Sequence, residues 1–204
     1  MIYLLTILSS MAVIAAFNLL VPAEGLTAIP VFFYVTMLTV AVILWDGIMA
    51  ALIRLLPEGW FAPDKRLFAV GRREGRLYQR LGVKYWKEFV PDLGCFTHFP
   101  KKSLLAPTDP AYTARYLLEA AYGIVIHAAN AVGGLLILPI FPSVALRIAL
   151  PVVLVNALLS LLPFCILRQN FPRLLRLHRH NQKRTPIANN GVDHTDNVKE
   201  YLHA

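Results

Sequence analysis

Apolar residues fill four long runs of this chain, and polar residues gather between and after them. The runs cover residues 2–21, 29–53, 117–140 and 144–167. Each is long enough to cross a bilayer core, which takes about 20 helical residues. The pattern predicts an all-α integral membrane protein with four transmembrane helices in one domain, 1–184. The polar, aperiodic segment 185–204 is predicted to be a disordered tail. No basic residue precedes the first run, which favours a retained helix over a signal peptide.

The charged residues indicate how the four helices cross the membrane. The chain has 204 residues, a net charge of +8 and an apolar fraction of 57%. Ten Lys and Arg residues lie in the loop 57–114, and seven more lie from Arg168 onward, whereas the short loops near Glu24 and Pro142 carry none. The positive-inside rule therefore places the large loop and both termini in the cytoplasm. Topology and anionic lipid headgroups account for the positive charge, so no nucleic-acid partner is predicted.

Part of the basic loop has the periodicity of a helix. Basic residues recur three and four positions apart at Arg73, Arg76, Arg80, Lys84 and Lys87. Leu77, Leu81 and Tyr85 line another face, and the pattern continues through Gly82. This arrangement predicts an interfacial helix that lies on anionic headgroups. A basic helix face in water, with no specific ligand, is the alternative interpretation.

Two prolines suggest helix boundaries near the third and fourth runs. Asp109 before Pro110 predicts an N-cap followed by the first residue of a helix. Pro172 predicts a break or a restart after the fourth run, because proline removes a backbone donor. The basic stretch from Arg173 to Arg184 then becomes a candidate surface helix.

The third apolar run carries Glu119, His127 and Asn130, which fall within one broad helical stripe. Polar and ionisable residues within a bilayer are costly and often functional. The second run adds Asp46, at about the depth predicted for His127, so that an Asp–His pair across two helices is possible. The fourth run adds Asn156 near its middle. The alternative is that these side chains form hydrogen bonds between helices and fix their packing.

An imidazole with a carboxylate partner is typical of a general base. His127, oriented by Asp46 or Glu119, would take the proton of a hydroxyl that attacks an acyl thioester. Asn130, Asn156 or Arg168 would donate hydrogen bonds to the developing oxyanion. The sequence contains no dinucleotide fingerprint, phosphate loop or nucleophile-elbow serine, and no cofactor or metal is predicted.

Three motifs appear in a characteristic order. The loop contains Trp86-Lys87-Glu88-Phe89-Val90-Pro91-Asp92-Leu93-Gly94, followed by Lys101-Lys102. Glu119 then precedes His127 by eight residues. The third motif comprises Asn156, Pro163, Arg168, Asn170, Pro172, Arg173 and Leu174. Over about 78–174 the chain thereby resembles the glycosyl-4,4'-diaponeurosporenoate acyltransferases, small membrane enzymes of staphyloxanthin-type carotenoid biosynthesis.

The resemblance implies a bacterial cell-membrane enzyme that transfers a fatty acyl group to a sugar hydroxyl of a glycosylated isoprenoid acid. A membrane glycolipid would be the acceptor, and an acyl-CoA-type donor would approach the basic cytoplasmic face. The residues assigned to substrate binding are Asn130, Asn156, Arg168, Asn170, Arg173, Trp86 and Lys87. Tyr122 and Ile124 stand where the family helix carries an Arg and a second Glu, which leaves another acceptor lipid open. Two other functions also remain open: an isoprenoid-lipid methyltransferase or reductase, and a non-catalytic lipid-binding protein.

Overall fold

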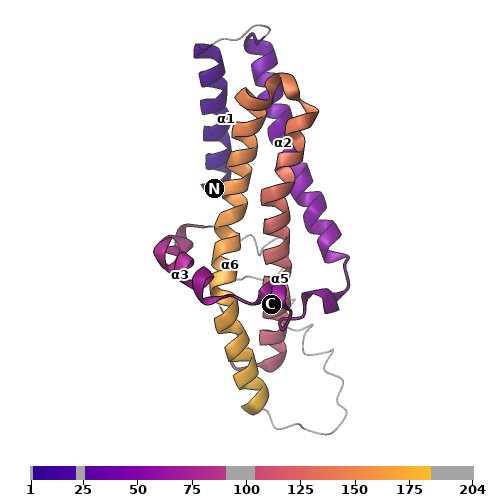
Figure 1. Ribbon diagram of the computed structural model, residues 1–204, viewed down its shortest axis with the longest axis vertical. Helices are drawn as coiled ribbons and strands as arrows, with labels where there is room; N and C mark the ends of the chain where they lie inside the picture. Colours follow the sequence, from indigo (N-terminus) through magenta and orange to yellow (C-terminus); the bar gives the residue numbers. More distant parts are fainter. Residues whose placement is uncertain (1, 22–25, 91–103, 185–204) are drawn as a thin grey trace. The chain divides into compact units, whose positions relative to one another are not determined.

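The computed structural model describes residues 2–21, 26–90 and 104–184, and the regular structure within these ranges is entirely helical (Figure 1). Four helical stretches of this described part are long and apolar enough to cross a membrane. They are Tyr3–Leu20, Ala28–Arg54, Pro110–Ile140 and Pro142–Arg184. The prediction of an all-helical protein with four helices of membrane-spanning length is confirmed.

The chain forms two compact units, and two of its helices contribute to both. We call residues 1–56 and 125–164 the apolar unit, and residues 57–124 and 165–204 the basic unit. Of the 20 Lys and Arg residues, only Arg54 and Arg147 belong to the apolar unit. The two units thus differ sharply in the charge that they carry.

The apolar unit is built on α1 (Ile2–Leu20) and α2 (Ala28–Arg54), which pack against each other in antiparallel directions (Figure 1). The second half of α5 (Pro110–Gly133) leads into the 3-10 helices η5 (Gly134–Ile140) and η6 (Pro142–Val144). The π-helix η7 (Ala145–Ala149) then opens α6 (Leu150–Arg184). Small and β-branched side chains, among them Val31, Val35, Ile148 and Ala149, form its buried core. Such residues let helices approach closely where no hydrophobic force from water assists.

One end of the apolar unit is held by polar contacts of Arg147. Its Nη1 donates a 2.6 Å hydrogen bond to the carbonyl oxygen of Val21, just beyond the end of α1. In return, Asn18 Nδ2 donates to the Arg147 carbonyl oxygen at 3.2 Å. These bonds satisfy carbonyl groups that a helix end and a π-helix would otherwise leave unpaired.

The basic unit consists of short helices together with the first part of α5 and the last part of α6. The bounds of the short helices are η1 (Glu58–Phe61), η2 (Arg66–Phe68), α3 (Arg72–Arg80), α4 (Val83–Trp86) and η3 (Lys87–Phe89). Aromatic pairs anchor these helices: Phe68 stacks on Phe171 of α6, with ring centroids 5.4 Å apart. Phe61 likewise packs on Tyr122 of α5, with centroids 4.3 Å apart. Such pairs contribute about 0.5–1.5 kcal/mol each beyond the area they bury.

The predicted start of the third helix is confirmed. α5 begins at Pro110, and Asp109 Oδ1 accepts a 2.8 Å hydrogen bond from the Ala111 backbone N–H, as an N-cap does. Its end differs from the prediction, because α-helical geometry stops at Gly133 and tightens to 3-10 over Gly134–Ile140. Pro139 lies within this segment and lacks the donor that an α-helix needs.

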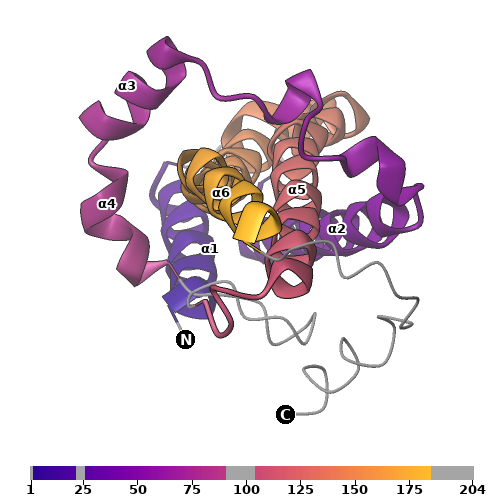
Figure 2. The same cartoon turned by 90° about the horizontal axis from the view of Figure 1, so that it is seen from below.

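The single interfacial helix predicted through Gly82 is wrong, because the structure divides it into α3 and α4. Gly82 has a φ of 64°, in the left-handed region that glycine adopts at little cost. Its N–H bonds back to the Gln79 carbonyl oxygen, which closes the end of α3. Figure 2 shows α3 and α4 as two separate helical segments joined by a short turn.

The break predicted at Pro172 is also wrong, since α6 continues from Leu150 to Arg184. A proline inside a helix costs roughly 3 kcal/mol. The neighbouring residues Phe171 and Leu174 are buried on the same turns, and their packing offsets the lost backbone bond. The candidate surface helix after Pro172 is therefore the last part of α6. The predicted disordered tail and the motif residues from Pro91 to Gly94 lie outside the described residues, as do Lys101 and Lys102.

Candidate functional site

Three predicted site residues meet inside the apolar unit, each from a different helix. Asn156 of α6 donates from Nδ2 to Asp46 Oδ1 of α2 at 3.3 Å. The same Nδ2 lies 3.5 Å from the backbone oxygen of Asn130 on α5. We call Asp46, Asn130 and Asn156 the polar cluster. It joins α2, α5 and α6 within a unit whose other buried residues are mostly apolar.

Two buried polar atoms beside the polar cluster have no hydrogen-bond partner in the described part of the chain. They are Asn130 Oδ1, an acceptor, and Trp45 Nε1, a donor. Buried polar atoms without partners cost free energy, and they occur rarely enough in proteins to need an explanation. A ligand with a hydroxyl group supplies both a donor and an acceptor. The two atoms therefore make the surroundings of the polar cluster a candidate place for a polar group of a ligand.

Two adjacent glycines allow the helices to approach closely at this place. A Cβ atom at Gly133 would overlap the indole ring of Trp45. A Cβ atom at Gly134 would lie 3.4 Å from Val153 and 3.7 Å from Asn156 Nδ2. Close approach of the backbone is what small residues provide in membrane helices. The absence of a Cβ atom at Gly133 thus leaves the space that the indole ring of Trp45, the neighbour of Asp46, occupies.

Asn156 also lines a small apolar cavity of about 40 Å³ between α1, α2 and α6. The other walls are mainly aliphatic, among them Met11, Val42 and Val152. The hydroxyls of Ser10 and Thr39 in these walls donate to carbonyl oxygens four residues earlier in their own helices. The cavity therefore presents hydrocarbon on most sides and one amide, that of the polar cluster.

His127 lies on α5 of the apolar unit, three residues before Asn130, and its side chain is half-buried. This spacing puts the two residues on neighbouring positions of one helix face. The pairing of His127 with Asp46 remains a prediction, while Asp46 has a defined hydrogen-bond donor in Asn156.

Glu119 lies on the part of α5 that belongs to the basic unit and is 1% exposed. Its Oε1 lies 3.0 Å from Nη2 of Arg115, one turn earlier in the helix. Arg115 is exposed enough to reach water. The pair keeps a deeply buried carboxylate next to a cation, as a buried charge requires.

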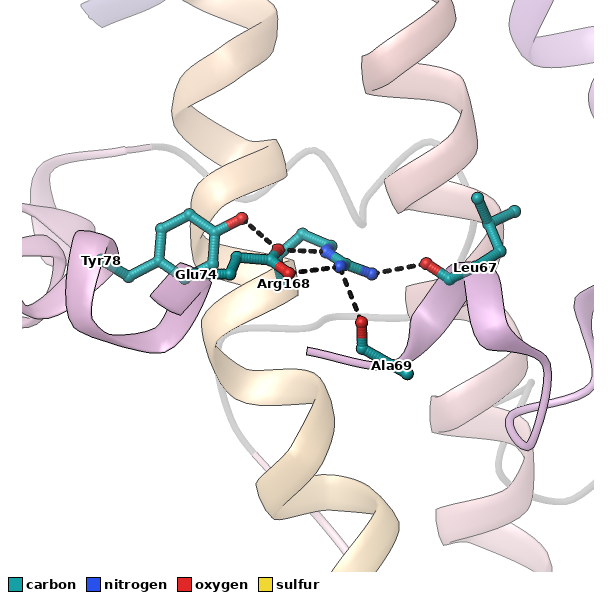
Figure 3. A network of polar contacts seen from close by, with 5 residues as sticks. All are labelled: Leu67, Ala69, Glu74, Tyr78 and Arg168. Carbon is teal, nitrogen blue, oxygen red and sulfur yellow. Dashed lines mark hydrogen bonds and ion pairs between the residues drawn. The ribbon is translucent and has the colours of Figure 1, made fainter. Parts of the chain in front are cut away.

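Arg168 makes four hydrogen bonds to other groups of the basic unit (Figure 3). Its Nε and Nη2 donate to the two carboxylate oxygens of Glu74, both at 2.7 Å. Nη1 donates to the Leu67 carbonyl oxygen at 2.7 Å, and Nη2 also donates to that of Ala69 at 3.1 Å. We call Arg168, Glu74 and Tyr78 the clamp, because it fastens α3 and the segment before it to α6. Two parallel bonds to one carboxylate are the strongest arrangement that arginine forms.

The electrostatics of the clamp follow from its contacts. Burial favours the neutral form of Glu74, but hydrogen bonds from Arg168 and Tyr78 and the positive charge of Arg168 hold its pKa below the usual value. Tyr78 donates to Glu74 Oε1 at 2.6 Å. Burial, together with this bond to a carboxylate, raises the pKa of Tyr78 above its usual value. The clamp is therefore an ion pair with a neutral phenol at neutral pH.

The remaining predicted substrate-binding residues lie in the basic unit. Trp86 Nε1 donates to the Leu81 carbonyl oxygen at 2.9 Å, and Lys87 Nζ lies 3.6 Å from Glu88. Asn170 is half-buried on α6, and Arg173 is exposed one turn later. Their roles in substrate binding remain predictions.

Sequence reasoning missed Trp45, Gly133, Glu74 and Tyr78. Trp45 and Gly133 have no distinguishing signal in the sequence, and only the structure shows that they are in contact. Glu74 offered one signal: it is an acidic residue inside a strongly basic helix, where a cation partner stabilises it. The distance of 94 residues between Glu74 and Arg168 hid which cation it is.

Four apolar helices of spanning length with polar groups among them define a small integral membrane protein. A model of the glycosyl-4,4'-diaponeurosporenoate acyltransferase family matches residues 57–180, more than half of the chain. The chain belongs to this family, and it is therefore an acyltransferase of the carotenoid biosynthesis type. No curated protein and no solved structure matches it. The matched range includes Glu119, His127 and Arg168, whereas Asp46 and Trp45 lie before it.

Proposed function

We propose that this protein transfers a fatty acyl group from a thioester such as acyl-CoA to a hydroxyl of a membrane glycolipid or glycosylated carotenoid acid. The observation that carries the proposal is the pair of unpartnered polar atoms, Asn130 Oδ1 and Trp45 Nε1, beside the polar cluster. A sugar hydroxyl has the donor and the acceptor that these two atoms lack. Membership of an acyltransferase family supports acyl transfer over methyl transfer or reduction.

In the proposed reaction His127 is the general base. Its imidazole takes the proton of the acceptor hydroxyl as the hydroxyl oxygen attacks the carbonyl carbon of the thioester. The tetrahedral intermediate then collapses, the carbon–sulfur bond breaks, and the thiolate leaves with the proton that His127 returns. An ester and a free thiol result, and the transfer involves no change of oxidation state. Asp46 or Glu119 stabilises the imidazolium that forms in between.

The amides of the polar cluster have the remaining tasks in this proposal. Asn130 and Asn156 donate hydrogen bonds to the oxyanion or hold the sugar, which an amide does through its Nδ2 and Oδ1 atoms. Arg168 has four hydrogen bonds to protein groups, and its contribution is to position α6. Asn170, Arg173, Trp86 and Lys87 contact the donor or the headgroup region.

We also propose that both termini and the loop 57–114 face the cytoplasm of a bacterial cell. The supporting observation is the concentration of 18 of the 20 Lys and Arg residues in the basic unit. A soluble acyl donor is made in the cytoplasm and is anionic, and it meets the positive side of the protein first.

The test is acyl transfer in membranes supplied with a glycosylated carotenoid acid and isotope-labelled acyl-CoA. Membranes that contain the wild type, His127→Ala or His180→Ala are compared by mass spectrometry at equal protein levels. His180 is an exposed histidine of α6 and serves as the matched control. We expect a labelled ester from the wild type and His180→Ala, and a loss of roughly 10²–10⁴-fold for His127→Ala. Equal product from both variants would remove His127 from the reaction, and no product from the wild type would refute this donor and acceptor.

A further inference from the structure

A large open groove lies in the basic unit, between α3, the turn to α4, and the last part of α6. Its volume is about 1080 Å³, at the upper end of the usual range for small-molecule sites. Five of its lining residues are basic: Arg72, Arg76, Lys84, Arg173 and Arg176. We call this the basic groove. It is distinct from the polar cluster, which belongs to the apolar unit.

No acidic residue lines the basic groove, and none of its five cations forms an ion pair within the described residues. The contrast with Arg168 is direct, because that arginine is neutralised by Glu74 at 2.7 Å. The positive-inside rule accounts for the presence of basic residues in this unit, but it does not require them to surround one groove. Cations that face one hollow without counter-charges attract a multiply charged anion.

The clamp gives the groove a fixed shape. Gln79 and the two arginines of α3 line one side, and Gln169 and the two arginines of α6 line the other. Arg168, which directly precedes Gln169 on α6, donates two hydrogen bonds to Glu74 of α3. Tyr78, whose hydroxyl bonds to Glu74, also lines the groove. The four arginines are thus carried on two helices that an ion pair joins, and Lys84 lies on α4 next to them.

The chemistry of the lining matches phosphate. Four of the five cations are arginines, whose planar guanidinium groups bind phosphate oxygens in pairs. Gln79 and Gln169 add neutral amide donors. Tyr85 adds an exposed aromatic ring, with Lys84 Nζ 4.6 Å from its centroid. A flat ring beside cations is a surface on which a planar base can stack.

We propose that the basic groove binds the phosphate groups of the acyl donor, a coenzyme A type molecule with several phosphates and a planar base. This assignment rests on the proposed function for the identity of the donor. The phosphate chemistry itself rests on the groove alone. Phosphates of a lipid headgroup have the same chemistry, and the experiment separates the two sources.

The test measures binding of coenzyme A to the full-length protein in uncharged detergent micelles, with pantetheine as the ligand that lacks phosphates. The groove variant is Arg72→Gln with Arg76→Gln. The matched control is Arg73→Gln with Arg80→Gln, which removes the same charge from exposed positions of α3 outside the groove lining. We expect the groove variant to raise the Kd for coenzyme A about tenfold or more, because each lost charged hydrogen bond is worth about a factor of ten. The control changes that Kd less than about threefold, as an effect of net charge alone.

Native mass spectrometry of the same proteins identifies the source of the phosphates. Loss of bound anionic phospholipid from the groove variant, with the Kd for coenzyme A unchanged, would overturn the donor assignment. Equal loss of coenzyme A binding in both variants, or equal affinity for pantetheine, would overturn the site itself. Acyl transfer is measured separately. If coenzyme A binds specifically but no acyl transfer occurs, the proposed function is refuted and the groove assignment stands. If acyl transfer occurs and the groove variant has an unchanged KM for the donor, the groove assignment is refuted and the proposed function stands.

Discussion

Arg168 in the basic unit and Asn130 in the apolar unit are both buried polar residues, yet their hydrogen bonding differs completely. Arg168 makes four hydrogen bonds and has a charge partner. Asn130 keeps an acceptor oxygen without a partner in the described part of the chain, and Trp45, the neighbour of Asp46, keeps a donor without one. A buried polar group that makes all its hydrogen bonds stabilises the fold, whereas one without a partner needs an explanation, such as a bound ligand or a water molecule. We therefore expect changes at Arg168 to affect mainly stability, and changes at Asn130 to test the proposed contact with the acceptor.

The largest effect on stability is expected at the clamp. Replacing Arg168 by Met leaves Glu74 as a half-buried carboxylate without its cation and removes the hydrogen-bond donor of the Leu67 and Ala69 carbonyls. Removing one partner of a fully buried ion pair costs about 3–5 kcal/mol, and access of water to the 27% exposed Glu74 side chain places the expected loss at the lower end of that range. We expect this loss in the free energy of unfolding, measured by thermal or denaturant unfolding in detergent.

Two further variants test the reason for that loss. Arg179→Met removes an exposed arginine of α6, and it is expected to change stability by less than about 0.5 kcal/mol. The double variant Arg168→Met with Glu74→Gln should recover part of the loss, because the uncompensated charge is gone. If the double variant is less stable than Arg168→Met, the ion pair is not the source of the stability.

Gly133 tests how tightly the helices of the apolar unit pack. An alanine Cβ at this position would overlap Trp45, whereas one at Gly47 meets no atom within 4 Å. Overpacking costs about 1–3 kcal/mol, and Gly→Ala in an open helix position stabilises by up to about 1 kcal/mol. We expect Gly133→Ala to lower the unfolding temperature and Gly47→Ala to maintain or raise it. The same shift in both variants would show that Trp45 is free to move away.

The elements that sequence patterns predicted are those set by one strong local constraint. The four long apolar runs became helices, because a bilayer-spanning segment must satisfy its own backbone hydrogen bonds. Asp109 and Pro110 begin α5 as expected, since the cap depends on adjacent residues. For the polar cluster, the sequence predicted only the depth and the helix face of each residue, because these follow from helix length and period. It did not predict which of the side chains form hydrogen bonds with one another.

The errors arose where tertiary packing or glycine geometry decided the outcome. Pro172 was expected to end a helix, but the buried Phe171 beside it holds α6 together. Gly82 was compatible with either a continuous helix or a left-handed turn, and the sequence does not distinguish them. The partners Glu74 and Arg168 are 94 residues apart, and no periodicity links residues at that separation.

The clamp also predicts how stability depends on pH. Hydrogen bonds and the charge of Arg168 hold the pKa of Glu74 below its usual value, so the unfolded chain takes up this proton more readily than the folded one. The stabilisation is therefore complete at neutral pH, and it is lost as the pH falls from the usual glutamate range through the lower folded pKa. We expect the difference in unfolding temperature between wild type and Glu74→Gln to stay constant from pH 7 to about pH 5 and to narrow from about pH 5 to about pH 2. Glu58→Gln, which replaces an exposed carboxylate of the same unit, provides the control. A constant difference across this range would contradict the assignment.

The smallest effect on stability is expected at Asn130, and it is the most informative about function. Its Oδ1 has no partner in the described ranges, so Asn130→Leu removes a polar atom that costs free energy in the folded state. The free energy of unfolding should stay within about 1 kcal/mol of the wild-type value or rise. Asn156→Leu instead breaks the hydrogen bond to Asp46 and should destabilise by about 1–3 kcal/mol. Acyl transfer should fall in both variants, because both amides face the proposed acceptor. A variant Asn130→Leu that is stable and fully active would show that the unpartnered oxygen serves no substrate, and the contrast between the two units would then describe architecture only.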